Sequence, residues 1–183
     1  MLYTRNGDSG ETGSYDSKKR IPKDSVLPEA LGTLDELNSF LGVIKTHTLD
    51  KKLIVAECGS TIVGILFCIQ QNLFIVGSEL AGSDKKISKE KVGWIEKTIA
   101  NIEKELPEIK QFRIAGGTRL SAELDYARAI ARRLERKAIT AKAEAPLSQN
   151  SYQFLNRLSS LLYALARLAN AHAGIDEDVP NYE

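Results

Sequence analysis

Apolar side chains recur at alternating spacings of three and four along five stretches of this chain. Residues three and four apart share one face of an α-helix, so each stretch predicts a helix with an apolar face for packing. The predicted helices span residues 28–46, about 58–81, 88–106, about 118–140 and 148–173. Pro28 suits a first helical turn, Ser88 and Ser148 are N-cap residues, and Pro107 ends the third helix.

No stretch of useful length alternates apolar and polar residues as a half-buried strand does. Five helices joined by short loops therefore predict an all-α fold, an up-and-down five-helix bundle. The second helix is apolar nearly all round, so it is expected to be the most central. The chain divides into a flexible glycine-bearing arm (1–26), the helical bundle domain (27–173) and a polar tail (174–183) that is expected to fray.

Composition narrows the function classes. With 25 basic and 24 acidic residues and a net charge of +1, the 183-residue chain has no bulk attraction to nucleic acid or to an anionic membrane. No apolar run approaches the about 20 residues of a membrane span, and no leader segment is recognised. The two cysteines, Cys58 and Cys68, have no metal-ligand spacing, so a reducing cytoplasm is expected.

Side chains that bind metals or act as nucleophiles are sparse in the sequence. The histidines, His47 and His172, lie near predicted helix ends, and no Glu-x-x-His pair is present to build a carboxylate-bridged metal site. We therefore expect no dedicated metal ligands from the protein. No serine or cysteine has the surroundings of a catalytic triad.

The fourth predicted helix carries four arginines, Arg128, Arg132, Arg133 and Arg136. Its apolar seam uses positions 120, 124, 127, 131, 134 and 138, and positions 128, 132 and 135 form a charged stripe beside it. A guanidinium is costly to bury alone, so these arginines should face a carboxylate, a phosphate or water. Both an anion site and a solvated, salt-bridged helix face agree with this pattern.

Three further features allow a functional and a plain structural interpretation. The arm combines Gly7, Gly10 and Gly13 with Arg5 and Lys23, which suits a polyphosphate but also a flexible terminus; it lacks the pattern of a P-loop. On the first helix, Asp35 and Asn38 share a face, and Asp35 is either a partner for Arg128 or an exposed acid. On the fifth, a polar stripe, which an ordinary bundle exterior also explains, contains Asn156, Ser160, Tyr163 and Arg167.

Several separated segments, in order, resemble the propanediol-utilisation type of ATP:cob(I)alamin adenosyltransferase. They are TRNGDSG at 4–10 with Pro22, Lys23 and Asp24, GTLDELNS at 32–39, AR at 127–128 with RRLER at 132–136, and LNRL at 155–158. The resemblance runs from about residue 3 to about residue 170. It implies a five-helix bundle that assembles as a homotrimer with active sites in the clefts between subunits.

The activity implied by the resemblance is transfer of the 5′-deoxyadenosyl group of ATP to the cobalt of reduced cobalamin, with release of triphosphate. Cobalamin is then a substrate, and Mg²⁺ accompanies ATP. Cobalt(I) is itself the nucleophile, which agrees with the lack of a protein triad. A reductase and a cobalamin-dependent enzyme are the further partners implied. The alternatives are a non-catalytic ATP-binding or cobalamin-delivering protein of the same shape, and a plain helical scaffold.

The same resemblance implies residue roles. Arg132, Arg136 and Phe112 are the expected catalytic residues, and Phe112, Asp35 and Arg128 the expected cobalamin-binding ones, with Asp35 and Arg128 as an ion pair near the corrin ring. Phe112 matches the aromatic that displaces the lower nucleotide ligand of cobalamin. The ATP-binding set is Thr4, Arg5, Asn6, Gly7, Thr12, Gly13, Lys23, Arg132, Arg133, Glu135, Arg136 and Asn156.

The chain departs from the family pattern at three places. Position 125 is Asp where His is usual, position 134 is Leu where Ala is usual, and Ala115-Gly116-Gly117 replaces Pro-Gly-Gly. The added carboxylate of Asp125 is expected to affect how a corrinoid binds or which one is preferred. The nucleotide set is intact, so ATP binding is the more secure expectation.

Overall fold

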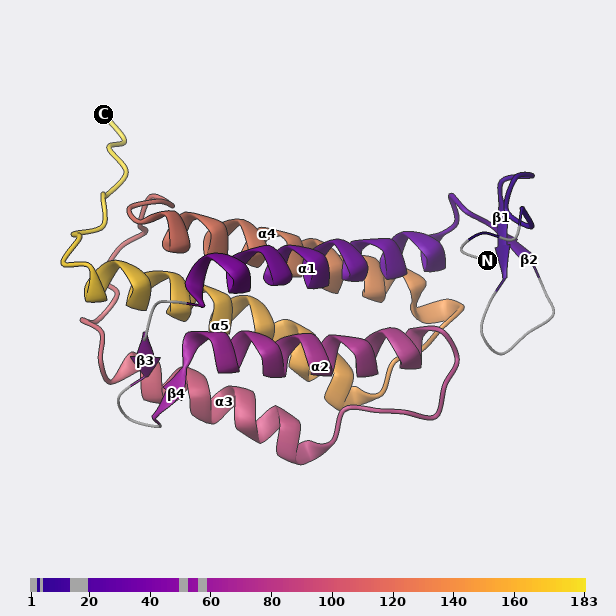
Figure 1. The fold of residues 1–183 in the computed structure, drawn as a ribbon, viewed down its shortest axis with the longest axis horizontal. Helices are drawn as coiled ribbons and strands as arrows, with labels where there is room; N and C mark the ends of the chain where they lie inside the picture. The colour runs from indigo at the N-terminus through magenta and orange to yellow at the C-terminus, as the bar shows by residue number, and fades with distance from the viewer. Residues whose placement is uncertain (1–2, 4, 14–19, 50–52, 56–58) are drawn as a thin grey trace.

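A computed structural model describes residues 3, 5–13, 20–49, 53–55 and 59–183 of the chain. Thr4 and Cys58, which enter the predictions above, lie outside these ranges. The described part contains five α-helices in an up-and-down bundle, which confirms the predicted fold (Figure 1). They are α1 (Val26–Thr48), α2 (Ile62–Leu80), α3 (Lys89–Glu103), α4 (Arg119–Thr140) and α5 (Gln149–His172).

Side-chain caps fix the beginnings of three helices. The hydroxyls of Thr61, Thr118 and Ser148 accept hydrogen bonds from backbone N–H groups three residues later, at 3.0, 3.0 and 3.4 Å. Such caps satisfy N–H groups that have no partner within the helix. Ser88 stands at the N-cap position of α3 as predicted, but its hydroxyl forms a hydrogen bond with the side chain of Glu90, which lowers the pKa of that carboxyl.

The core lies where α5 meets its neighbours. α4 and α3 pack on α5, while α1 packs on both α4 and α2 (Figure 1). Residues 164–170 of α5 are buried without interruption. On α2, by contrast, Phe67 and Phe74 are 50% and 65% exposed. The expectation that the second helix is the most central is therefore wrong, because an apolar sequence does not by itself bury every face of a helix.

Two short hairpins precede and follow α1. β1 (Glu11–Gly13) pairs antiparallel with β2 (Arg20–Pro22), and β3 (Ile54–Val55) pairs with β4 (Ser60–Thr61). Strands of two or three residues are too short to show a period-two pattern, so the sequence did not predict them. The first hairpin gives the described part of the arm a defined shape.

α2 also corrects the expectation about apolar runs. At 19 residues and a mean hydropathy of 1.5, it is the one helix of the described chain that is long and apolar enough to cross a membrane by length and composition. A core helix of a bundle passes the same test, and Leu66, Ile69 and Leu73 of α2 are fully buried in this fold.

The polar tail is not frayed at its beginning, contrary to expectation. The backbone N–H of Ile114 donates to the carbonyl of Asp178 at 2.9 Å, and Arg113 donates to the carbonyl of Glu177 at 3.0 Å. The Glu177 carboxylate accepts from Arg167 of α5 at 2.9 Å. These contacts join the tail to the segment 104–118 between α3 and α4, which we call the connector.

Candidate functional site

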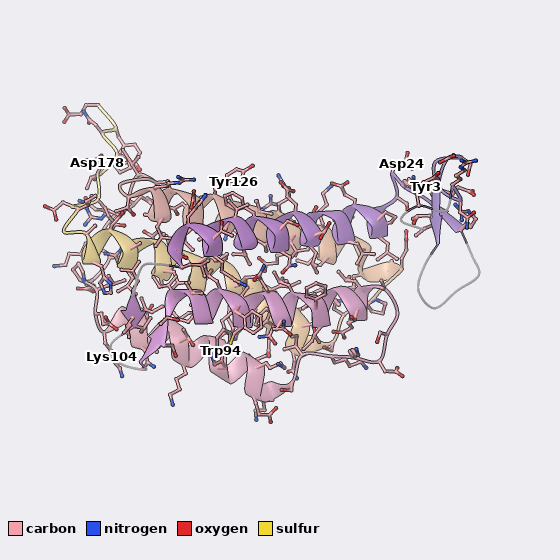
Figure 2. All side chains as sticks on the ribbon, in the orientation of Figure 1. Tyr3, Asp24, Trp94, Lys104, Tyr126 and Asp178 are labelled. Atoms are coloured by element: carbon pink, nitrogen blue, oxygen red, sulfur yellow. The ribbon has the colours of Figure 1, made fainter. Side chains whose placement is uncertain are left out.

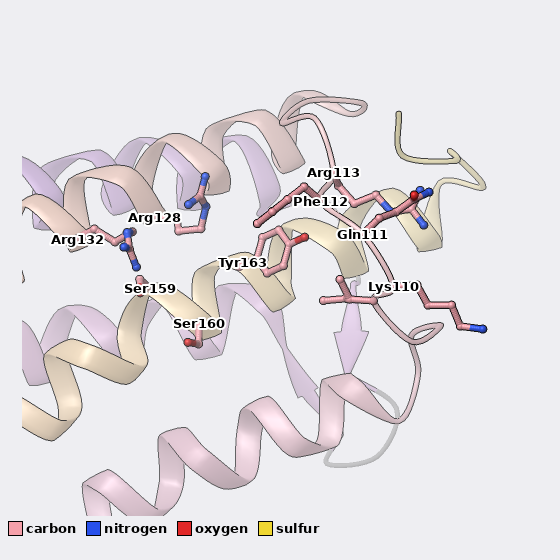
Figure 3. Close-up of a pocket in the computed structure, with 10 residues that line it drawn as sticks. Lys110, Gln111, Phe112, Arg113, Arg128, Arg132, Ser159, Ser160 and Tyr163 are labelled. Carbon is pink, nitrogen blue, oxygen red and sulfur yellow. The ribbon is translucent and has the colours of Figure 1, made fainter. Parts of the chain in front are cut away.

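A cavity of about 560 Å³ lies between the connector, α4 and α5 (Figure 3). The connector supplies one wall, α4 supplies two arginines, and α5 supplies two serines and a tyrosine. The lining residues are Ile109, Lys110, Gln111, Phe112, Arg113, Arg128, Arg132, Ser159, Ser160 and Tyr163. The cavity thus combines cationic side chains with an aromatic and aliphatic wall, a mixture that suits a large ligand with both apolar and polar groups.

Arg128 is held in this cavity by its own helix and by α5. Its Nε lies 2.9 Å from Oδ1 of Asp125, one turn earlier on α4, and its guanidinium carbon lies 5.8 Å from the ring centroid of Tyr163. Asp125 is 9% exposed, so this carboxylate neutralises the guanidinium at a largely buried position. The residue that departs from the family pattern therefore fixes the orientation of Arg128.

The expected pairing of Asp35 with Arg128 does not form within the chain. Asp35 is exposed on α1, whereas Arg128 pairs with Asp125. The physical reason is spacing: residues 125 and 128 are three apart on one helix and need no tertiary contact to meet. A cobalamin-side role for Asp35 stays a prediction.

Phe112 stands out as an exposed aromatic at the cavity. It is 81% exposed, and Ile109 beside it is 49% exposed. Figure 3 shows Phe112 of the connector and Tyr163 of α5 at the wall of the same cavity. Apolar side chains that gather at a cavity and remain open to solvent are typical of a ligand site.

Arg132 and Arg136 continue the row of arginines along α4. Arg132 lines the cavity one turn beyond Arg128, and Arg136 follows after another turn. Both are exposed, and among the described residues neither forms an ion pair. Two positive charges without a protein partner beside a cavity are available to an anion, which favours the anion-site interpretation over a salt-bridged face.

The neighbouring polar residues of α4 already have partners. Arg133 pairs with Glu36 of α1, which raises the pKa of the Arg133 guanidinium chiefly through this hydrogen bond. Glu135 accepts a hydrogen bond from the side-chain amide of Asn156 on α5 at 2.9 Å. The structure therefore brings Glu135 and Asn156 together, as members of one site should be, while Arg133 faces α1.

The arm is internally tied and lies away from the cavity. The Nζ of Lys23 donates to the carbonyl of Gly7 at 2.8 Å. Arg5 has a positive φ of 62° and stacks on Tyr3 with 5.6 Å between its guanidinium carbon and the ring centroid. Arg20 donates to the Glu11 carbonyl at 2.8 Å.

The arm and the connector occupy opposite ends of the molecule. Figure 2 places Tyr3 and Asp24 at one end and Asp178, which bonds to the connector, at the other. Thr12 and Gly13 line a different cavity, of about 490 Å³, beside the start of α1. The structure thus joins Phe112, Arg128 and Arg132 in one site, but it does not bring the arm residues Arg5, Asn6, Gly7, Thr12, Gly13 and Lys23 to it.

Some residues of the site were not among the sequence-predicted ones. Tyr163 and Ser160 were noted only as parts of a polar stripe that an exterior face also explains, and Arg167 of that stripe is buried with Glu177 instead. Ile109, Lys110, Gln111 and Arg113 had no recognisable signal, because an irregular connector has no periodicity to place its side chains. Ser159 lies on α5, where a serine beside the apolar seam is no signal of a site. No cluster of three or more His, Cys, Asp or Glu residues suited to a metal ion occurs among the described residues.

The chain matches known proteins over most of its length. The family model described as cobalamin adenosyltransferase matches residues 2–169. The chain is 36% identical to a corrinoid adenosyltransferase of Bacillus subtilis, covering 96% of this chain and 90% of that protein. It is 34% identical to a cobalamin adenosyltransferase of Cupriavidus metallidurans, covering 94% and 90%.

A solved structure supports the same relationship. A variant PduO-type ATP:corrinoid adenosyltransferase from Lactobacillus reuteri, complexed with cobalamin and ATP, matches with a TM-score of 0.89 and 31% identity. The match covers 100% of this chain and 97% of that one. The likeness therefore extends over the whole bundle and includes the segments that form the cavity.

Proposed function

The chain belongs to the cobalamin adenosyltransferase family, and from this premise we propose that it transfers the 5′-deoxyadenosyl group of ATP to cobalt(I) of cobalamin. The observation that carries the proposal is one cavity in which an exposed aromatic, Phe112, stands beside Arg128 and Arg132. The apolar wall suits the corrin ring, and the arginines beside this wall suit an anionic group of the second substrate. The products are adenosylcobalamin and triphosphate.

The proposed reaction needs no nucleophile from the protein. Cobalt(I) attacks the 5′ carbon of the ribose, the cobalt–carbon bond forms, and the bond from that carbon to the triphosphate oxygen breaks. The triphosphate leaves with the electron pair of that bond. The protein has to align cobalt with the 5′ carbon and stabilise the charge that develops on the leaving group.

Phe112 and Arg128 are the proposed cobalamin-binding residues of the cavity, with Asp35 as a third. The exposed ring of Phe112 offers an apolar surface beneath the corrin, which favours cobalamin without its lower ligand and so eases reduction from cobalt(II) to cobalt(I). Arg128, fixed by Asp125 and Tyr163, presents a guanidinium for the polar edge of the ring system.

Arg132 and Arg136 are the proposed catalytic partners of the triphosphate. Successive arginines on α4 lie one turn, or about 6 Å, apart, which matches the reach of an extended polyphosphate. Arg133, Glu135 and Asn156 complete the proposed ATP set from the helices. The arm supplies the rest of that set, namely Thr4, Arg5, Asn6, Gly7, Thr12, Gly13 and Lys23, whose backbone N–H groups and cations suit phosphate oxygens.

Mg²⁺ is proposed to enter with ATP. Among the described residues no group of carboxylates and histidines is arranged as a metal site, which supports binding of the ion chiefly through the phosphate oxygens and water. The ion offsets negative charge on the triphosphate. The arginines of α4 then supply the fixed part of the electrostatic stabilisation.

A homotrimer is proposed because one chain alone does not assemble the whole residue set. The arm lies at the far end of the molecule from the connector, so it is placed to reach a neighbouring copy rather than its own cavity. Co-expression of a Lys23→Ala chain with an Arg136→Ala chain tests this arrangement. Random mixing restores about a quarter of the sites if arm and α4 come from adjacent copies, and none if each chain acts alone.

The decisive test of the activity is spectroscopic. The purified chain, cobalamin, ATP, Mg²⁺ and a chemical reductant should produce the absorbance change of adenosylcobalamin, dependent on ATP. Binding of ATP and cobalamin without this change would favour a non-catalytic delivery protein of the same shape. No ATP-dependent thermal shift would contradict both functions.

The cellular setting follows from the same chemistry. Generation of cobalt(I) needs an electron donor, so a reductase is a proposed partner, and the product suits a cobalamin-dependent enzyme. Cys68 is a free, exposed cysteine, which suits a reducing compartment, and we place the protein in the cytoplasm.

A further inference from the structure

The connector that carries Phe112 has no regular secondary structure, yet its two ends are firmly attached to α5. At its start, both terminal nitrogens of Arg167 donate to the carbonyl of Pro107 at 3.3 Å. At its end, the side-chain amide of Asn170 donates to the Gly116 carbonyl at 2.9 Å and accepts from the backbone N–H of Thr118 at 3.0 Å. Adjacent turns of one buried helix thus hold both ends.

The glycine pair before α4 is required for the second attachment. Gly117 has a φ of +98°, and a Cβ built on it would stand 2.6 Å from Oδ1 of Asn170. A side chain at this position would strain the backbone and displace the amide that bonds to Gly116 and Thr118. Asn170 is 2% exposed, so the whole attachment is shielded from water.

The tail holds the middle of the connector, directly after Phe112. Arg113 donates to the Glu177 carbonyl at 3.0 Å, and the Ile114 N–H donates to the Asp178 carbonyl at 2.9 Å. Segment 109–112, just before these bonds, is exposed throughout and lines the cavity. The position of Phe112 therefore depends on where the tail is held.

Glu177 joins the tail to the helix core. Its carboxylate accepts from Nε of Arg167 at 2.9 Å, with side-chain exposures of 5% for Arg167 and 14% for Glu177. Its backbone carbonyl accepts a hydrogen bond from the guanidinium of Arg113. The Nε of Arg113 is buried and has no hydrogen-bond partner among the described residues. One carboxylate thus lies at a mostly enclosed position with two guanidinium groups close by, where its loss leaves buried positive charge uncompensated.

We infer that Arg167, Glu177 and Arg113 form a latch that positions Phe112 for the corrinoid, so that the C-terminal tail is part of the corrinoid side of the site. The inference rests on the proposed function, because it assigns the latch to corrinoid rather than to ATP. Arg167 and Glu177 are positioning residues that act through the connector, while Arg113 both joins the connector to the tail and lines the cavity.

Glu177→Gln in the full chain tests the latch. The amide keeps the size of the side chain and an oxygen acceptor but removes the charge that holds Arg167. We expect the KM for cob(II)alamin to rise about tenfold, the scale of a misplaced binding group, while the KM for ATP stays within about twofold. The spectral signature of cobalt(II) without its lower ligand should weaken in parallel.

Glu96→Gln is the control for the loss of another ion pair to α5. Glu96 of α3 pairs with Arg157 of α5, the helix that also carries Arg167, at 2.5 Å. This pair lies between α3 and α5, away from the connector. It should leave both KM values and the spectrum unchanged. Equal changes in the two variants, a parallel rise of both KM values in Glu177→Gln, or no change in it would overturn the latch.

Hydrogen exchange separates the latch from the proposed function. The Ile114 amide and peptide 107–118 should exchange faster in Glu177→Gln than in the unchanged chain without any substrate present. Unchanged exchange would contradict the latch even if the enzyme is active, whereas a failure of the unchanged chain to form adenosylcobalamin would contradict the function alone. Should Glu177→Gln not fold, Arg113→Gln removes the tail contact with a smaller loss and must shift the same readouts in the same direction.

Discussion

The two halves of the proposed site differ in how completely one chain builds them. On the corrinoid side, Phe112, Arg128 and Tyr163 come from three segments and meet at one cavity. On the nucleotide side, Arg132 and Arg136 lie exposed on α4, and the arm folds on itself at the far end of the molecule. The corrinoid half is thus largely formed in a single chain, whereas the nucleotide half is not.

The difference follows from the contacts that hold each half. Buried residues of α5 and the tail fix the connector, so the corrinoid side is positioned by the core of the bundle. The arm is held by its own hairpin, with Lys23 engaged by the Gly7 carbonyl. A polyphosphate at Lys23 shares the three donors of the ammonium with this carbonyl or displaces it, so a rearrangement of the arm is expected to accompany ATP binding.

The largest effect is expected from the nucleotide half. Arg136→Ala or Arg132→Ala should cost about 3 kcal/mol in kcat/KM, more than a hundredfold, because each removes a fixed positive charge from the leaving triphosphate. Formation of adenosylcobalamin under saturating reductant is the measurement. Arg119→Ala, an exposed arginine at the other end of α4, is the control and should retain activity. Normal turnover in Arg132→Ala and Arg136→Ala would break the assignment.

The corrinoid half should respond differently. Phe112→Ala removes the apolar surface beneath the corrin, so reaction that starts from cobalt(II) should lose about 2 kcal/mol, near thirtyfold, while the KM for ATP is nearly unchanged. Phe74→Ala, which removes an exposed aromatic of α2 far from this cavity, provides the comparison. If Phe112→Ala weakened ATP and corrinoid equally, the two halves would not be separable.

The sequence predicted the structure correctly where apolar residues repeat at helical spacing or where a capping residue marks a helix end. The existence of all five helices, the apolar seam of α4, the Ser148 cap and the end of α3 before Pro107 could be predicted, because packing and capping leave a local signal. The connector and the latch could not. Arg167 and Glu177 meet through tertiary contacts of an irregular segment, and the sequence shows only a polar stripe and a polar tail.

The partner of Arg128 shows the same limit. Resemblance to the family pointed to Asp35, but Asp125, which replaces the usual His, is three residues from Arg128 on the same helix and takes the pair within the chain. The spacing was available in the sequence, and a helix places such residues side by side. A carboxylate one turn away on the same helix therefore competes with a more distant carboxylate for the arginine.

A double-mutant cycle tests the pairing of Arg128 with Asp125, and the expected coupling is of moderate size. Asp125→Ala and Arg128→Ala should couple by about 1 kcal/mol in the free energy of unfolding, because the pair is part-buried with Asp125 more enclosed than Arg128. Urea titrations of the two single variants and the double variant give the coupling. If the two single variants lost unfolding free energy additively, the Asp125–Arg128 pair would not contribute to stability. In the parallel cycle with Asp35, coupling beyond about 0.5 kcal/mol would place Asp35 of a second copy at Arg128.

The smallest effect concerns Arg133, a member of the proposed nucleotide half that faces α1. Its guanidinium pairs with Glu36, and this contact raises its pKa, so the group stays charged throughout the working pH range and titrates in neither half. Both side chains are exposed by more than two-fifths, so the pair should contribute no more than about 0.5 kcal/mol to stability.

Glu36→Gln releases Arg133 and should lower the KM for ATP about twofold, since a carboxylate no longer competes with phosphate for the guanidinium. Lys137, which pairs with Glu29 one turn further along the same helix interface, offers the matched case: Glu29→Gln should leave the KM for ATP unchanged. An identical response in both variants would mean that Arg133 belongs to the α1–α4 contact and not to the nucleotide half.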